Sequence, residues 1–318
     1  MLVLNASEVS GLLNLDALIE ALGPAMVELS AGRVSMPSRT AALVQGQGLL
    51  GTMPAYLPSS RTLSCKLVTV FPGNAKRDLH THQAVVMLFD ADTGTPKAML
   101  DGAVITAIRT AAGSALATRL LAREDASTLL IVGTGVQAKS HAYAMSRVLK
   151  VKELRIAGRD GERTAKLASG LSRELGIDAK SHAIGHEAFV GAQVVCATTD
   201  AAEPVVKGAW LEPGVHVNSV GLNPAGRELD AEAVIGARVF VESRAAALSP
   251  PPSGAGELAG ATVHAEIGEV LAGTRKGRES AGQITLYKSV GVAVQDAVAA
   301  QLVYDAALAR RVGTEIAF

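Results

Sequence analysis

The residues best suited to bind a phosphate group lie near the middle of the chain, in the run Gly133-Thr134-Gly135-Val136-Gln137-Ala138. In a turn from a strand to a helix, the first glycine of such a run permits the tight bend, and the second lets the backbone approach a pyrophosphate. The small third residue lets the helix pack on the strand, and the N-terminus of that helix offers free N–H groups to the phosphates. The run therefore predicts a dinucleotide site.

Alternating strands and helices surround this turn. The hydrophobic pattern predicts helices over residues 137–149 and 162–175, and strands over 153–157, 194–197, 215–220 and 237–241. Such alternation is typical of a parallel sheet with helices on its faces. Residues 245–256 are uncharged and rich in Pro, Ser and Gly, so they are expected to form a surface loop.

The first part of the chain has a different pattern. It predicts strands over 49–53, 62–70 and 83–90, which would form a mostly antiparallel sheet, and helices over 16–31 and 103–122. Residues 292–311, after the alternating region, again read as a helix. The dinucleotide turn thus begins only after a substantial preceding region.

Length, composition and charge set outer limits on the class of protein. A chain of 318 residues suggests two domains, and its 48% of hydrophobic residues can bury sizeable cores. The 30 basic and 30 acidic residues give no electrostatic argument for a nucleic-acid or membrane partner. The first 25 residues lack the apolar segment of a secretory signal, and Cys65 and Cys196 fit the reduced thiols of the cytosol. We expect a soluble cytoplasmic enzyme.

Two cations have positions that could hold a carboxylate. Arg109 carries a planar guanidinium that can bind both oxygens of an amino- or imino-acid carboxylate. Lys66 lies in an otherwise apolar strand, where desolvation would lower its pKa and allow proton exchange. From the residues alone, the alternative remains that Lys66 extends from a strand edge and that Arg109 makes an ordinary ion pair.

Four other titratable residues are less informative. His80 and His82 are two residues apart, but no carboxylate or cysteine stands at a ligand spacing from them, so no metal site is expected. His216, inside an apolar strand, is expected to be a hydrogen-bonded core histidine. Asp296 is either a helix cap or an acid on the substrate side, and the sequence leaves this open.

Six ordered motifs carry a resemblance to a known family. They are Gly51-Thr52-Met53-Pro54-Ala55-Tyr56, Lys66-Leu67-Val68-Thr69, Asp101-Gly102 with Thr106-Ala107-Ile108-Arg109-Thr110-Ala111-Ala112, Gly133–Ala138, His216-Val217-Asn218-Ser219-Val220-Gly221, and Tyr287-Lys288-Ser289-Val290-Gly291. Through them the chain resembles the ornithine cyclodeaminase/mu-crystallin family over essentially its full length. The resemblance implies an α/β fold in which a Rossmann-type, doubly wound parallel-sheet domain (118–288) is inserted in an α+β substrate-binding and dimerisation domain (1–117 plus 289–318). It also implies a homodimer.

The resemblance also implies site residues. Lys66 and Arg109 would be catalytic, and the substrate would be bound by Arg39, Lys66, Thr81, Arg109 and Asn223. The cofactor would be bound by Thr110, Gly133, Thr134, Gly135, Val136, Gln137, Arg159, Thr198, Thr199, Val220, Gly221, Ser289 and Gly291. Of these, Val220, Gly221, Ser289 and Gly291 would lie close to the nicotinamide.

The choice of cofactor depends on the residues after the second strand of the parallel sheet. NAD sites place a carboxylate there for the ribose 2′-hydroxyl, whereas NADP sites offer a cation to the 2′-phosphate. This chain has Gly158 at the acidic position and Arg159 directly after it. The sequence therefore favours NADPH, with NADH possible and Asp160 as the competing acid.

Asn223 is the main departure from the cyclodeaminases, which have an aspartate at this place. An amide cannot accept a proton, so general-base catalysis on an amine is lost there. We therefore expect an NAD(P)H-dependent reductase of small 2-imino acids, such as pyrroline-2-carboxylate or piperideine-2-carboxylate. The alternatives are an ornithine cyclodeaminase, an amino-acid dehydrogenase of the alanine type, and a non-catalytic NADPH-dependent binding protein like mu-crystallin.

Overall fold

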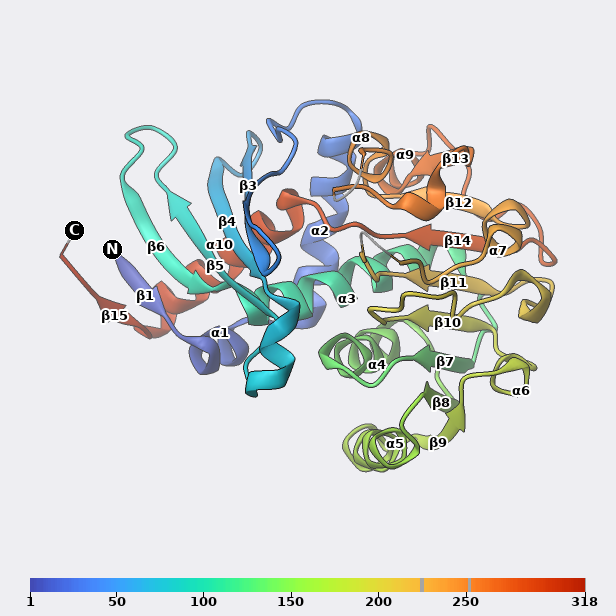
Figure 1. Ribbon diagram of the computed structural model, residues 1–318. Coiled ribbons are helices and arrows are strands. Elements are labelled where there is room, and N and C mark those ends of the chain that lie inside the picture. Colours follow the sequence, from blue (N-terminus) through green and yellow to red (C-terminus); the bar gives the residue numbers. More distant parts are fainter. Residues whose placement is uncertain (224–225, 251–252, 318) are drawn as a thin grey trace. The chain divides into compact units, whose positions relative to one another are not determined.

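The chain forms two compact units in the computed structural model, which describes residues 1–223, 226–250 and 253–317. Unit 1 consists of Met1–Arg109 and Val292–Phe318, and unit 2 consists of Thr110–Gly291 (Figure 1). Unit 2 is therefore inserted in the sequence of unit 1. The domain boundaries predicted from the sequence, 117/118 and 288/289, lie near these limits and stay a prediction.

Unit 1 is built on one mixed sheet with the strand order β15-β1-β6-β5-β4-β3-β2. Neighbouring strands are antiparallel except β1 and β6, which run parallel. The strands are β1 (Leu2–Leu4), β2 (Thr40–Val44), β3 (Gly48–Leu57), β4 (Thr62–Val70), β5 (His82–Phe89), β6 (Pro96–Asp101) and β15 (Thr314–Glu315). The helices are α1 (Ala6–Leu12), α2 (Leu15–Ser30), the 3₁₀ helix η1 (Pro72–Arg77) and α10 (Ala293–Arg310).

Strand β4 shows how this sheet places a polar residue in the interior. Successive side chains of a strand point to opposite faces, and here Thr62, Ser64 and Lys66 are buried while Leu63 and Cys65 are half-buried. Helix α10 packs against β3, β4 and β5. Lys66 is thus directed into the layer between the sheet and α10.

Helix α3 (Gly102–Leu121) passes from one unit into the other. It begins directly after Asp101, whose carboxylate accepts a hydrogen bond from the N–H of Val104 at 2.8 Å. A side-chain acceptor at this point satisfies one of the free N–H groups of the first turn. The cap fixes the start of the helix that carries Arg109 and Thr110 in its middle.

Unit 2 contains a fully parallel sheet with the strand order β13-β12-β14-β11-β10-β7-β8-β9. Its strands are β7 (Thr128–Val132), β8 (Glu153–Gly158), β9 (Asp178–Ala183), β10 (Val194–Ala197), β11 (His216–Ser219), β12 (Arg238–Val241), β13 (Val263–Glu266) and β14 (Thr285–Lys288). The chain adds β8 and β9 on one side of β7 and then returns to place β10 on the other side. The sheet is doubly wound, as predicted, and its topological switch point lies between β7 and β10.

The helices of unit 2 connect these strands. They are α4 (Val136–Val148), α5 (Gly161–Leu175), α6 (His186–Phe189), α7 (Ala231–Ile235), α8 (Arg244–Ala247), α9 (Ile267–Leu271) and the 3₁₀ helices η2 (Gly208–Trp210) and η3 (Gly256–Leu258). The expectation of a surface loop over 245–256 holds only in part for the described residues of that segment. Residues 245–247 belong to α8, and Ala247 and Ala255 are buried in the apolar core of unit 2, whereas residues 248–250 and 253–255 form neither helix nor strand. Residues 251 and 252 lie outside the described residues.

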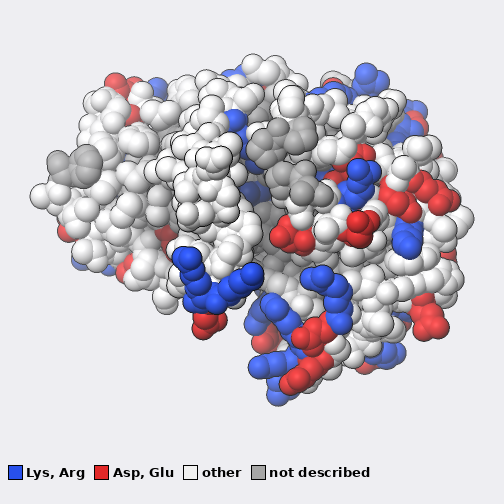
Figure 2. Space-filling model, viewed as in Figure 1, with Lys and Arg blue, Asp and Glu red and all other residues white. Residues whose placement is uncertain are grey.

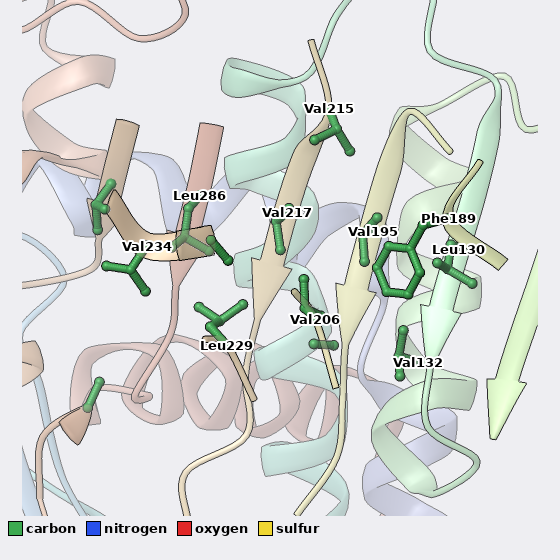
Figure 3. Close-up of a cluster of buried hydrophobic side chains, with 14 of the residues drawn as sticks. Leu130, Val132, Phe189, Val195, Val206, Val215, Val217, Leu229, Val234 and Leu286 are labelled. Atoms are coloured by element: carbon green, nitrogen blue, oxygen red, sulfur yellow. The ribbon is translucent and has the colours of Figure 1, made fainter. Parts of the chain in front are cut away.

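The core of unit 2 combines apolar side chains of the parallel strands with apolar side chains of the helices and connections beside them (Figure 3). Leu130 and Val132 of β7, Val195 of β10 and Val217 of β11 contribute to it, and Phe189 closes it beside Trp210 with ring centroids 5.2 Å apart. Close packing of this kind holds the carboxyl ends of the strands in fixed positions.

Charges of both signs are interspersed on the surface of unit 2, most clearly around α4 and α5 (Figure 2). Lys139 is paired with Glu174 there, and Lys180 is paired with Asp178. No helix within the described residues is both long enough and apolar enough to cross a membrane.

Candidate functional site

A buried cluster of three charged residues lies in unit 1. The Nζ atom of Lys66 is 2.8 Å from Oδ2 of Asp296, and Nε of Arg109 is 2.9 Å from Oδ1 of the same carboxylate. The three side chains are 2%, 6% and 1% exposed for Lys66, Arg109 and Asp296. One carboxylate thus bridges two cations, and the cluster keeps an excess of positive charge.

The first turn of α10 holds this cluster in place. Asp296 lies in that turn, where the positive end of the helix dipole favours a carboxylate. The neighbouring Gln295 accepts hydrogen bonds at Oε1 from Nη1 of Arg109 at 3.0 Å and from the N–H of Val292 at 3.3 Å. The Arg109 guanidinium therefore has two fixed partners on α10, which orient it.

Burial and neighbouring charges shift the pKa values of the cluster. Burial lowers the pKa of Lys66 to about 8; the charge of Asp296 opposes this shift, and that of Arg109 adds to it. For Asp296, burial acts to raise the pKa, but the charges of Arg109 and Lys66 outweigh it and the pKa lies below its usual value. Near neutral pH, Asp296 is ionised and Lys66 is a cation that can release its proton.

Two further residues, His82 and Arg39, interact electrostatically with Lys66. His82 of β5 is on the same face of the sheet, and burial together with the charges of Lys66 and Arg109 lowers its pKa to about 4. Arg39 is half-buried, and its charge acts on Lys66 as well. Thr81, predicted near the substrate, is exposed, and its carbonyl accepts a hydrogen bond from the N–H of Phe71. At the start of β5, therefore, His82 and not Thr81 lies near the charged cluster.

The predicted dinucleotide turn lies in unit 2, where β7 ends. Gly133 has φ 125°, and a Cβ atom there would come within 2.6 Å of Oγ1 of Thr198. Thr198 donates this hydroxyl to the carbonyl of Val132 at 3.0 Å, so the end of β10 is fixed against the turn. Only glycine fits at Gly133, and the turn stands at the switch point of the sheet, where ligands bind in such folds.

Helix α4 presents its N-terminus at the same place. Gly135 occupies the N-cap without a side-chain cap, and a Cβ atom there would meet open space. The adjacent Val136 is 63% exposed. An uncapped helix N-terminus with open space before it is suited to a pyrophosphate, and the residues fit a dinucleotide. Thr134, Val136 and Gln137 lie beside this N-cap, and their contact with a cofactor stays a prediction.

The end of β8 has no room for the carboxylate typical of NAD sites. A Cβ atom on Gly158 would come within 2.2 Å of Oγ1 of Thr164 and 2.8 Å of Cγ2 of Thr134. Thr164 is buried and donates its hydroxyl to the carbonyl of Asp160 at 2.5 Å. Asp160 is the N-cap of α5, with its side chain accepting from the N–H of Arg163 at 3.0 Å. Arg159 is exposed and carries the only charge of the Gly158–Asp160 segment that is not used as a helix cap.

Two buried carboxylates, which sequence reasoning missed, occupy the donors of other predicted cofactor residues. Glu228 accepts from the N–H and hydroxyl of Thr199 at 2.6 and 2.8 Å, and from the N–H of Gly221 at 2.8 Å. Glu242 accepts from the Ser289 hydroxyl at 2.5 Å and from the N–H of Gly291 at 3.2 Å. These four residues lie at the ends of β10, β11 and β14, but the N–H and hydroxyl groups named here already donate hydrogen bonds to Glu228 or Glu242.

The remaining predicted site residues lie at strand ends or on helix α3. Val220 donates its N–H to the carbonyl of Ala197, Thr110 is buried on α3, and Asn223 is half-buried after β11. His216 is a hydrogen-bonded core histidine, as expected, with Thr285 at 2.9 Å and Asn218 at 3.3 Å. Within residues 1–223, 226–250 and 253–317, no group of three His, Cys, Asp or Glu side chains could hold a metal ion.

The sequence left the role of Asp296 open between a helix cap and a substrate-side acid, and Gln295, Glu228, Glu242 and Lys288 were missed. Asp296 and Gln295 are polar positions inside an apolar helical run, which indicates a buried polar contact without identifying its partner. Glu228 and Glu242 lie in stretches with no recognisable spacing, and Lys288 stands in a motif that by itself indicates no role for its side chain. Their partners come from other segments, so only the fold brings them together.

Comparisons with known proteins agree with this architecture. The family model described as "Ornithine cyclodeaminase/mu-crystallin family" matches residues 1–311. The ketimine reductase mu-crystallin of Mus musculus is 41% identical over 308 residues, covering 95% of this chain and 96% of that protein.

Two solved structures share the fold over nearly the whole chain. The Δ(1)-pyrroline-2-carboxylate reductase of Thermococcus litoralis, in complex with NADH and L-proline, has a TM-score of 0.94 at 36% identity, covering 99% of this chain and 100% of that one. An archaeal alanine dehydrogenase dimer with bound NAD has a TM-score of 0.92 at 33% identity, covering 100% of this chain and 99% of that one. By the family model and these similarities, the chain belongs to the ornithine cyclodeaminase/mu-crystallin family.

Proposed function

We propose that this protein is an NAD(P)H-dependent reductase of small 2-imino acids, which it converts to L-amino acids. The observation that carries the proposal is the buried cluster in which Asp296 bridges Lys66 and Arg109. Two cations against one carboxylate leave one positive charge for the carboxylate of the substrate. The ketimine and pyrroline-2-carboxylate reductases among its relatives act on substrates of this class.

Arg109 and Lys66 have different roles in this proposal. Arg109, already oriented by Asp296 and Gln295, binds the substrate carboxylate with its guanidinium. Lys66, with its pKa lowered to about 8, supplies the proton that the imine nitrogen needs. A dinucleotide held at the turn after β7 would supply the hydride, and this hydride together with the proton from Lys66 would convert the C=N group to an amine. The charge of Arg39 contributes to lowering the pKa of Lys66, and the charge of Lys66 contributes to lowering the pKa of His82, so both residues are neighbours of the proposed proton donor.

The cofactor preference belongs to the proposal as well. With the acidic position closed at Gly158 and Asp160 used as a helix cap, Arg159 is left to meet a 2′-phosphate. NADPH should therefore bind more tightly than NADH, although both would donate a hydride.

Asn223 favours imine reduction over amine oxidation. Removal of a hydride from an amine requires that the amine first lose a proton, and an asparagine cannot accept one. Reduction of a preformed imine needs no base. We therefore rank imine reduction above ornithine cyclisation and above alanine-type dehydrogenation. A non-catalytic binding role is disfavoured because Lys66, Arg109 and the dinucleotide turn are all retained.

We also propose that the protein acts in the cytoplasm as a homodimer formed through unit 1. The face of its sheet opposite to Lys66 carries half-buried apolar side chains in register, with Leu63 opposite Phe89 and Cys65 opposite Met87. Apolar side chains of this kind gain free energy when a second copy covers them. A Met87→Asp variant should sediment as a monomer in analytical ultracentrifugation if this face is the interface.

The proposed reaction is tested with a panel of cyclic and linear 2-imino acids and the matching amino acids. Each is supplied with NADPH or NADH, and turnover is followed by the nicotinamide absorbance. The proposal expects rapid oxidation of NADPH with at least one imino acid and a much slower reverse reaction from amino acids at neutral pH. Turnover of amino acids alone would overturn it.

A further inference from the structure

Both backbone groups of Gly221 are held by buried charges of opposite sign. Its N–H donates to Oε2 of Glu228 at 2.8 Å, and its carbonyl accepts from Nζ of Lys288 at 2.6 Å. Glu228 is 2% exposed and Lys288 is 0% exposed. The backbone of Gly221, just after β11, is thus fixed by a hydrogen bond at its N–H and another at its carbonyl. We call Glu228, Ser219 and Lys288 the Gly221 clamp.

The hydroxyl of Ser219 connects the two charges. It donates to Oε2 of Glu228 at 2.8 Å and accepts from Nζ of Lys288 at 3.0 Å. The other oxygen of Glu228 is bound by Thr199, and Lys288 is paired with Glu257 at 2.9 Å. Every buried charge of the clamp therefore has a partner, which compensates for the loss of hydration.

The space around Gly221 is equally restricted. A Cβ atom there would come within 2.3 Å of the carbonyl oxygen of Thr199 and within 2.5 Å of the Glu228 carboxyl carbon. The clamp therefore joins the carboxyl ends of β10, β11 and β14 through charged hydrogen bonds, which are stronger than neutral ones and fix geometry. An ordinary turn needs no such arrangement, because water can satisfy its backbone groups.

We propose that Glu228 and Lys288 are positioning residues, which hold Gly221 and the chain leading to Asn223 where the nicotinamide must lie for hydride transfer. The inference rests on the proposed function, in which Val220 and Gly221 line the nicotinamide. Glu228 and Lys288 are both buried and paired with groups of unit 2. They act through the backbone of Gly221, and the small displacement that follows their loss impairs the reaction more than it impairs binding.

The test compares three variants with a matched control. Glu228→Gln keeps the shape but loses the charge, Lys288→Met removes the donor to the Gly221 carbonyl, and Ser219→Ala removes only the bridging hydroxyl. Glu28→Gln is the control, because Glu28 of unit 1 is also a buried carboxylate, 5% exposed, that accepts from Ser59 at 2.6 and 3.1 Å.

Two quantities are measured for each variant: the Kd for NADPH, from the fluorescence of the bound nucleotide, and the rate of hydride transfer in a single turnover by stopped flow. The inference expects the single-turnover rate to fall by on the order of 10²-fold in Glu228→Gln and Lys288→Met, and less in Ser219→Ala. The Kd for NADPH should change little, and Glu28→Gln should match the unmodified protein in both quantities.

Two results would overturn the inference. Single-turnover rates that stay unchanged in the clamp variants overturn the inference, and so does a Kd that rises in proportion to the loss of rate. If Glu228→Gln or Lys288→Met fails to fold, the milder Ser219→Ala decides between the outcomes. A lack of turnover in the unmodified protein would contradict the proposed function instead, and the two failures are thus distinct.

Discussion

Lys66 and Asp296, which lie far apart in the sequence, form a buried ion pair with Nζ and Oδ2 2.8 Å apart. The lysine comes from the middle of β4 and the aspartate from the first turn of α10. The pair ties the last helix of the chain to the sheet of unit 1. The charge of Asp296 also opposes the lowering of the Lys66 pKa by burial.

The first prediction concerns the pH dependence of imine reduction. Because Lys66 must be protonated to donate, activity should be present at low pH and should fall as the pH rises through about 8, its pKa in the folded protein. The charge of Asp296 opposes the lowering of this pKa, so Asp296→Asn should lower it further. We expect the alkaline limb of the kcat profile to move to lower pH in this variant.

Ionisation of the substrate affects the pH profiles of both proteins equally, because both are assayed with the same imino acid. A difference between the two alkaline limbs therefore comes from the protein. A limb at the same pH in both proteins would mean that a group other than Lys66 supplies the proton.

The second prediction concerns Arg109. Its replacement in Arg109→Ala should raise the KM for the imino acid by at least about tenfold, since a charge-assisted hydrogen bond contributes roughly 1.5–3 kcal/mol. The Kd for NADPH should change little. Arg119→Ala is the matched control, because Arg119 is exposed on the same helix. A variant that loses NADPH binding but keeps its KM would show that Arg109 serves the cofactor.

The third prediction concerns cofactor choice. Arg159→Ala should weaken NADPH binding by at least about tenfold and leave NADH binding nearly unchanged, because only NADPH carries the 2′-phosphate. Equal affinities for the two cofactors in the unmodified protein would contradict this assignment. Titration of nucleotide fluorescence measures both values.

The closed position at Gly158 gives a fourth prediction. Gly158→Asp alone should destabilise the protein and fail to improve NADH use, since the new side chain would collide with Thr164. The double variant Gly158→Asp with Thr164→Ala removes the nearest atom and should gain NADH use relative to the single variant. The kcat/KM values for both cofactors, with melting temperatures, check this. A single variant that is stable and uses NADH well would show that the position is open.

The fifth prediction concerns Asn223. Ornithine cyclisation moves protons at nitrogen in several steps, and general acid–base help is worth about 10²–10⁴-fold. Imine reduction should therefore exceed proline formation from ornithine by at least that order, and Asn223→Asp should narrow the difference. Efficient ornithine-to-proline conversion by the unmodified protein would show that another residue supplies the base.

The features of the fold that could be predicted from the sequence are those that depend on the local pattern of residues. The glycine spacing at 133–138 located the turn after β7, and the hydrophobic pattern located β4 and β10 with the bounds that the structure shows, because that pattern follows from each element's own burial. Short strands such as β1, β9 and β15 were missed, since their pairing depends on distant segments.

The candidate site could be predicted only in part, for the same physical reason. Lys66 and Arg109 stood out as cations in apolar surroundings, but nothing local indicated that one carboxylate, Asp296, would bridge them. Glu228 likewise has its four hydrogen bonds to residues before it in the chain. Contacts of this kind are set by the topology, which a single sequence does not display.

The most direct test of the central claim follows the hydride itself. The unmodified protein is incubated with pyrroline-2-carboxylate and NADPH deuterated at C4 of the nicotinamide, in turn on each face, and the product is analysed by mass spectrometry and NMR. The account predicts L-proline with one deuterium at C2 from one of the two labelled cofactors, and little product with Arg109→Ala. Absence of proline, with other 2-imino acids equally unreactive, or proline without deuterium at C2 from either cofactor, would contradict it.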